Sequence, residues 1–132
     1  MNGNKSALPD SNLIILASKQ QIDTEKLLSL YDEFYVSIVT YMEVYAYDFQ
    51  NQSEKDLIDE FFANLEIVEV NRAIADQAIV YRKNKIKRTK LPDAIILATA
   101  KYLNADLFSD DWDDFQGIDN SVNVLNLDPL KI

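Results

Sequence analysis

Short apolar runs alternate with longer segments of helical periodicity along the chain. The short runs predict strands at residues 6–8, 33–38, 66–69, 106–108 and 122–126. The longer segments repeat their apolar positions every three or four residues and predict helices at residues 12–18, 24–31, 40–47, 54–64, 72–84 and 93–103. Because strands and helices alternate, we predict an α/β fold with a parallel sheet between layers of helices.

The length of 132 residues suits one hydrophobic core but not two. No repeat, low-complexity tract or Pro/Gly/Ser-rich linker divides the sequence, so we predict a single domain over residues 1–132. A lone lysine and Asp10 precede the first apolar run, which is unlike a signal peptide. No apolar run approaches the ~20 residues of a membrane span. We therefore expect a cytoplasmic protein with no membrane partner.

The composition restricts the chemistry that is open to the chain. It has no cysteine and no histidine, which excludes disulfides, the usual zinc sites and histidine-dependent nucleophiles. Any metal must be a hard cation bound by oxygen. The two glycines, Gly3 and Gly117, are too few and too far apart for a P-loop or a dinucleotide-binding loop.

The charge is distributed unevenly. The net charge is -9, yet six of the thirteen basic residues lie in the stretch RKNKIKRTK, residues 82–90, which contains no acid. We call this stretch the basic patch. It gives an otherwise acidic chain one cationic region, and it ends three residues before Asp93.

Three single acids lie where a strand gives way to a helix or where a helix begins, which is where open α/β sheets bind ligands. Each also has a structural interpretation. Asp10 suits a helix N-cap, and Glu43 follows Thr40 at the spacing of a capping box. Asp93 follows Pro92 at a helix start, where an acid complements the helix dipole.

A fourth acidic site is the stretch SDDWDDF, residues 109–115. Neighbouring like charges repel, so the crowding favours a bound cation, a solvated turn or helix caps. A calcium EF-hand loop is excluded because the fifth, sixth and twelfth positions from Asp111 are Phe115, Gln116 and Val122. A solvated loop that buries Trp112 and Phe115 in the core is the structural alternative.

Together, four stretches resemble the PIN-domain ribonucleases, especially the short VapC-type toxins. They are PDSNLII, SIVTYMEV, LPDAIILATA and LFSDDWDDF, and they have the order and spacing of that family's motifs over most of the chain. The resemblance implies a three-layer α/β/α sandwich. Its central sheet would have five parallel strands in the order 3-2-1-4-5, which makes the first and fourth strands neighbours.

The resemblance also implies a function, that of a metal-dependent endoribonuclease, the toxin of a toxin–antitoxin pair. Its cofactor would be Mg²⁺ or Mn²⁺, ions that activate water and stabilise phosphate oxygens during hydrolysis of RNA phosphodiester bonds. Matched residue by residue, the metal-binding and catalytic acids are expected to be Asp10, Glu43, Asp93, Asp111 and Asp114.

The partners implied by the family are an RNA substrate, a second copy of the chain in a homodimer, and an antitoxin. Single-stranded or looped RNA needs cations beside the site, which the basic patch supplies. A solvated helix end is the structural alternative for the patch. The residues expected to contact RNA are Lys85, Lys87, Arg88, Lys90 and Ser109.

Some features depart from the family pattern or leave a choice open. Pro9 and the polar lead MNGNKS predict a first strand that is short or irregular. Ser109 stands where the family usually has threonine. Asp110 is an alternative to Asp111 as the inward-facing acid, and Asp113 is expected to face solvent.

Two other function classes compete with the nuclease. An inactive PIN-like domain would bind RNA or protein, with the acids serving as helix caps, and would have no affinity for metal. An aspartyl-phosphate enzyme or receiver domain shares the α/β layout. However, PDSN lacks the second aspartate of a D-x-D motif, and no acidic pair lies near the first strand.

Overall fold

Five parallel strands form the central sheet in the order β3-β2-β1-β4-β5. The structure is a computed structural model that describes residues 5–132. The strands are β1 (Ser6–Pro9), β2 (Glu33–Ser37), β3 (Glu66–Val68), β4 (Asp106–Phe108) and β5 (Val124–Leu125). The predicted sheet order is therefore confirmed, with β1 and β4 as neighbours at the centre.

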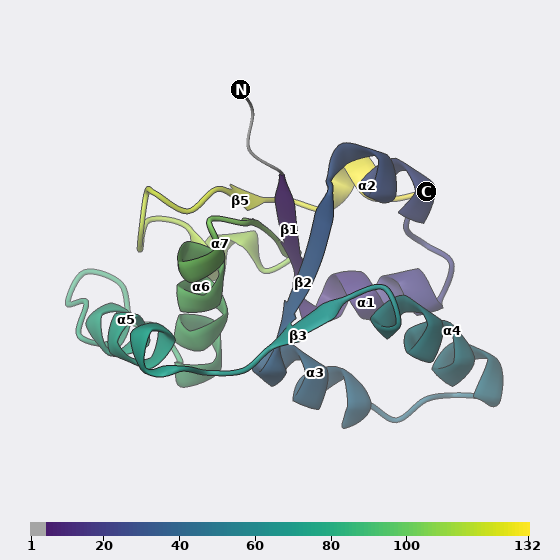
Figure 1. The fold of residues 1–132 in the computed structure, drawn as a ribbon, viewed down its shortest axis with the longest axis horizontal. Coiled ribbons are helices and arrows are strands. Elements are labelled where there is room, and N and C mark those ends of the chain that lie inside the picture. Colours follow the sequence, from purple (N-terminus) through teal and green to yellow (C-terminus); the bar gives the residue numbers. More distant parts are fainter. Residues whose placement is uncertain (1–4) are drawn as a thin grey trace.

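Helices cover both faces of this sheet (Figure 1). One side carries α5, α6 and α7, and the other carries α1, α2 and α4. The helices are α1 (Ser11–Ser18), α2 (Thr24–Leu30), α3 (Ile38–Tyr45), α4 (Gln52–Phe62), α5 (Arg72–Arg82), α6 (Leu91–Leu103) and α7 (Trp112–Phe115), followed by the 3-10 helix η1 (Asp128–Leu130). This arrangement is the predicted α/β/α sandwich.

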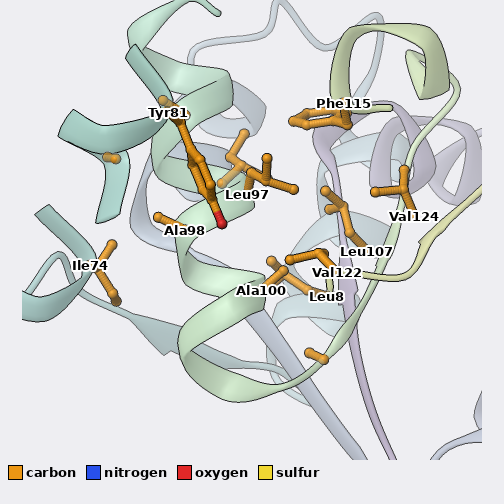
Figure 2. Packing of buried hydrophobic residues seen from close by; sticks show 14 of the residues in the cluster. Leu8, Ile74, Tyr81, Leu97, Ala98, Ala100, Leu107, Phe115, Val122 and Val124 are labelled. Atoms are coloured by element: carbon orange, nitrogen blue, oxygen red, sulfur yellow. The ribbon is translucent and has the colours of Figure 1, made fainter. Parts of the chain in front are cut away.

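The central strands β1 and β4 supply apolar side chains to both faces of the sheet. Successive strand residues point to opposite faces, so Ala7 and Phe108 pack against α1 and α2, while Leu8 and Leu107 pack against α5 and α6. Figure 2 shows Leu8 and Leu107 beside α6, in the same cluster as Leu97. Each fully buried leucine contributes about 1.5–3 kcal/mol. Burial on both faces explains why the buried residues of these strands are all apolar.

The first strand is short but regular. Residues of β1 pair in parallel with both neighbours, and Pro9 lies opposite Phe108. Pro9 can end this inner strand because the next residue, Asp10, donates its backbone N–H to Phe108 O at 2.8 Å. The prediction of an irregular strand is therefore wrong and that of a short one is right. Residues 1–4 of the polar lead lie outside the described residues.

Other boundaries differ from the predicted ones. The last strand covers only Val124 and Leu125, although Val122 is also buried. The acidic stretch is not a plain loop, because Trp112–Phe115 form helix α7. Phe115 is buried as predicted, but Trp112 is 37% exposed and does not plug the core.

Helix α6 ends at Asn104, whose left-handed backbone (φ 53°) closes the helix where glycine is more usual. Among residues 5–132, no helix combines the length and the apolar character that crossing a membrane requires.

Candidate active site

Asp10 and Ser109 lie side by side because the two central strands end in register. Asp10 follows β1 and Ser109 follows β4. The Ser109 hydroxyl donates to Asp10 Oδ2 at 2.9 Å, and the Ser11 backbone N–H donates to Asp10 Oδ1 at 2.7 Å. Asp10 therefore caps α1, as its structural interpretation predicts, but its second oxygen is directed across the sheet to the end of the neighbouring strand.

Asp10 is an unusual cap because it is only 4% exposed. Burial raises the pKa of its carboxyl from the ordinary 3.8 to about 6, against the lowering effect of the Ser11 and Ser109 hydrogen bonds. The charges of Asp93 and Asp111 raise the pKa further. Burying a carboxylate beside two others is unfavourable for folding alone, which is typical of a functional site.

Glu43 belongs to the same group of acids. Although Glu43 is exposed as a whole residue, desolvation of its carboxyl raises its pKa, and the charges of Asp10, Asp93 and Asp111 raise it further. Its capping-box interpretation is wrong, because α3 begins one turn earlier, with Ser37 as the N-cap accepting from the Val39 N–H at 3.1 Å. Glu43 thus lies in the second turn of α3, where it has no capping role.

Asp93 lies in the first turn of α6, where it complements the helix dipole as predicted. Burial raises the pKa of Asp93, and the charges of Asp114 and Asp111 add to the rise, whereas the Lys90 charge lowers it. The dipole alone would lower this pKa. Asp93 is half-buried, and the direction of its pKa agrees with a position near the other acids.

Asp111, not Asp110, faces the space among these acids. The charge of Asp111 raises the pKa of Asp10, Glu43 and Asp93. The Asp111 backbone N–H donates to Ser109 Oγ at 2.9 Å. The Asp110 carboxylate instead pairs with Lys131 at 3.0 Å. Asp113 is exposed, as predicted.

Asn12 is a polar contact that the sequence did not single out. Its amide Nδ2 donates to Asp111 Oδ2 at 3.2 Å, and its Oδ1 accepts the Asp110 backbone N–H at 3.1 Å. Its place in the PDSN motif was the available signal, but the partner lies 98–99 residues away in the sequence.

The donors that surround this space suit a hard cation, because they are carboxylates without thiolate or imidazole. They do not enclose one tightly: within residues 5–132, no three acidic side chains lie close enough together to hold a single ion. Mutual repulsion keeps free carboxylates apart. A divalent cation would have to draw them together, with water completing its coordination.

The basic patch borders this group of acids through Lys90, which caps α6 three residues before Asp93. Lys85, Arg88 and Lys90 are exposed, as RNA contacts require. Lys87 is not available in the same way, because its ammonium donates to backbone carbonyls in and beside α7. Ser109 is fully buried and bonded to Asp10, which places it in the frame of the site, and its contact with RNA stays a prediction.

The family model for the PIN domain matches residues 7–120. The chain belongs to the PIN-domain family. The PIN-domain motifs at Asp10, Glu43, Asp93 and Asp111 all fall within the matched residues. No curated protein matches the chain in sequence.

Solved structures agree with this assignment. A chain of a toxin–antitoxin complex from Klebsiella pneumoniae is 28% identical with a TM-score of 0.74, covering 96% of this chain and 99% of that one. A chain of VapBC2 from Rickettsia felis, bound to a promoter DNA fragment, is 18% identical with a TM-score of 0.76 over 93% and 99% of the two chains. A chain of DNA-bound VapBC from Salmonella typhimurium is 16% identical with a TM-score of 0.77, covering 95% of this chain and 99% of that one. This PIN domain therefore has the fold of chains found in toxin–antitoxin complexes.

Proposed function

We propose that this PIN domain is a metal-dependent endoribonuclease that acts as the toxin of a toxin–antitoxin pair. The observation that carries the proposal is the convergence of acids from four separate parts of the chain. Desolvation and mutual repulsion raise the pKa values of Asp10, Glu43 and Asp93 together. Such repulsion destabilises the fold, whereas it favours the binding of a cation that neutralises the acids.

The residues that would hold Mg²⁺ or Mn²⁺ are Asp10, Glu43, Asp93, Asp111 and Asp114. When bound, such an ion lowers the pKa of a coordinated water and stabilises charge on phosphate oxygens. The protein supplies the orientation: Ser109 fixes Asp10 Oδ2, and Asn12 fixes Asp111 Oδ2. Hydrogen bonds of this kind to metal ligands set their direction and strengthen binding.

RNA is the proposed substrate, held by Lys85, Arg88 and Lys90. Replacing Lys85 and Arg88 by alanine should weaken RNA binding and flatten the slope of log affinity against log salt by about 1–2, since each lost phosphate contact removes about 0.7 for single strands. Lys55 and Lys26 lie on α4 and α2, across the sheet from the patch (Figure 1), so their double alanine variant is the matched control. A slope that changes equally in both variants would contradict an RNA contact at the patch.

An antitoxin partner is supported by the Klebsiella pneumoniae structure, which contains a toxin–antitoxin complex and matches nearly the whole chain. A homodimer, which rests on the family resemblance, and a cytoplasmic location, which rests on the sequence pattern, stay predictions. Light scattering of the purified chain, alone and with the product of a neighbouring gene, would test both protein partners.

A non-catalytic PIN-like binding domain is the second candidate. The specific observation in its favour is that no three acids within residues 5–132 lie close enough to hold one ion. The two functions differ in a direct assay. Wild-type protein should cleave total RNA with Mn²⁺ and stop when EDTA is added, while a folded Asp93→Asn variant should leave the RNA intact. Cleavage at equal rates by both proteins, or by neither, would contradict the nuclease.

A further inference from the structure

Lys87 differs from its neighbours in the basic patch because its side chain turns inward. Its ammonium donates to the backbone carbonyl of Gln116 at 2.6 Å and also to that of Asp113. Lys87 is half-buried, whereas Lys85 and Arg88 are exposed. The cation is therefore bonded across 26–29 residues of sequence to the last turn of α7.

Helix α7 needs an external partner of this kind. A helix of four residues is too short to be stable alone, and its last carbonyls have no partner within the helix. A cation at a helix C-terminus bonds to those carbonyls and favours the dipole. Phe115 in the core and the Trp112 indole, which donates to Val124 O at 3.2 Å, hold the other side of α7.

The loop that carries Lys87 is itself fixed. The Asn84 side-chain oxygen accepts the backbone N–H groups of Ile86 and Lys87 at 2.8 and 3.1 Å, which closes a tight turn after α5. The same loop leads into α6, where Asp93 lies six residues after Lys87. A displacement of either segment would thus be transmitted to the other through the lysine.

We propose that Lys87 is a positioning residue of the metal site, tying the loop before α6 to the end of α7 so that Asp111 and Asp114 stay opposite Asp93. This proposal rests on the proposed function. Helix α7 also contacts α6, the helix that carries Asp93 in its first turn. Lys87 acts through these acids and does not itself touch the metal or the RNA.

Two effects of a Lys87→Met substitution on Mn²⁺ affinity have opposite directions, the loss of a charge and the loss of the contact with α7. Removing a cation from the vicinity of the acids should by itself tighten Mn²⁺ binding. Losing the tether to α7 should weaken it, by about tenfold if Lys87 matters as much as other groups that orient metal ligands. Lys85→Met is the matched control, because it removes the same charge from an exposed position of the same loop. Lys87→Arg keeps both the charge and the donors.

Two measurements on the full chain test the proposal. The first is acrylamide quenching of Trp112, the only tryptophan, which reports on α7 without any metal. The second is the Mn²⁺ dissociation constant from calorimetry. We expect Lys87→Met to increase quenching and weaken Mn²⁺ binding, Lys87→Arg to stay close to wild type, and Lys85→Met to leave quenching unchanged.

Each outcome bears on one claim. Equal quenching in Lys87→Met and Lys85→Met would contradict the stabilisation of α7 by Lys87. Increased quenching with unchanged or tighter Mn²⁺ binding would overturn the positioning role. If wild type binds no Mn²⁺, the proposed function fails, and the quenching comparison still decides the tether. Circular dichroism checks folding, and Lys87→Gln, which is polar but uncharged, replaces Lys87→Met if that variant does not fold.

Discussion

Replacing Asp10 by asparagine should stabilise the fold at neutral pH, although Asp10 lies at the centre of the proposed site. Asparagine keeps the shape of the side chain and the ability to cap α1. It removes a negative charge that is 4% exposed and repelled by Asp93 and Asp111. Acids retained for function at a cost in stability are common in enzyme sites.

The magnitude follows from the pKa of Asp10, which rises from 3.8 to about 6 on folding. Above pH 6 the folded carboxylate is ionised at a cost of about 3 kcal/mol, since one pKa unit corresponds to 1.36 kcal/mol. Between the two pKa values the folded state binds more protons than the unfolded state, so stability falls as pH rises. Asparagine also perturbs the Ser109 hydrogen bond, at about 1 kcal/mol. The net gain expected at pH 7.5 is about 2 kcal/mol.

Urea denaturation of wild type and Asp10→Asn in EDTA, at pH 7.5 and at pH 4, measures this difference. The advantage of Asp10→Asn should disappear towards pH 4, where folded wild type carries a proton on Asp10. Added Mn²⁺ should stabilise only wild type, because a ligand stabilises the state that binds it. A variant that is less stable than wild type at pH 7.5, or an advantage that does not depend on pH, would refute the assigned burial and repulsion.

Three further predictions concern the frame of the site. Phe115→Ala should lower the free energy of unfolding by about 3–4 kcal/mol in urea, since Phe115 is 1% exposed and its loss leaves a cavity; a loss below about 1 kcal/mol would contradict its core position. Ser109→Ala should raise the pKa of Asp10 above its wild-type value in a carboxyl NMR titration, because the Ser109 hydrogen bond lowers that pKa. Asn104→Ala should cost about 1 kcal/mol in thermal unfolding and Asn104→Gly should not, since the φ of 53° is left-handed; equal losses would show that the Asn104 side chain matters instead.

Much of the fold could be predicted because the sheet is buried on both faces. The buried strand residues, such as Leu107 and Phe108, are then apolar on both faces, and the helices between the strands keep a helical period. Their order in the sheet came from the family resemblance, not from the periodicity. The short helix α7 was missed because all four of its residues are polar or aromatic and form no periodic pattern. Its contacts are with parts of the chain far away in the sequence: Phe115 packs in the core, and the Lys87 ammonium donates to Gln116 O.

The candidate site could be predicted only in part, for a related reason. Acids at strand ends mark an edge of a parallel sheet, and this signal is local. The choice between Asp110 and Asp111 depends on Lys131 and Asn12, which lie far away in the sequence. Likewise, no spacing within the basic patch reveals that Lys87 turns towards α7 while Lys85 stays exposed.

The proposed nuclease activity depends on the acids binding a divalent cation, and a calorimetric titration with Mn²⁺ tests this without knowledge of the RNA target. Wild type and an Asp10→Asn, Asp93→Asn double variant would be compared, with circular dichroism as the check on folding. We predict stoichiometric binding by wild type and none by the folded variant. Absence of Mn²⁺ binding by wild type, even with RNA present, would contradict the nuclease and leave the acids as caps and charges of a binding domain.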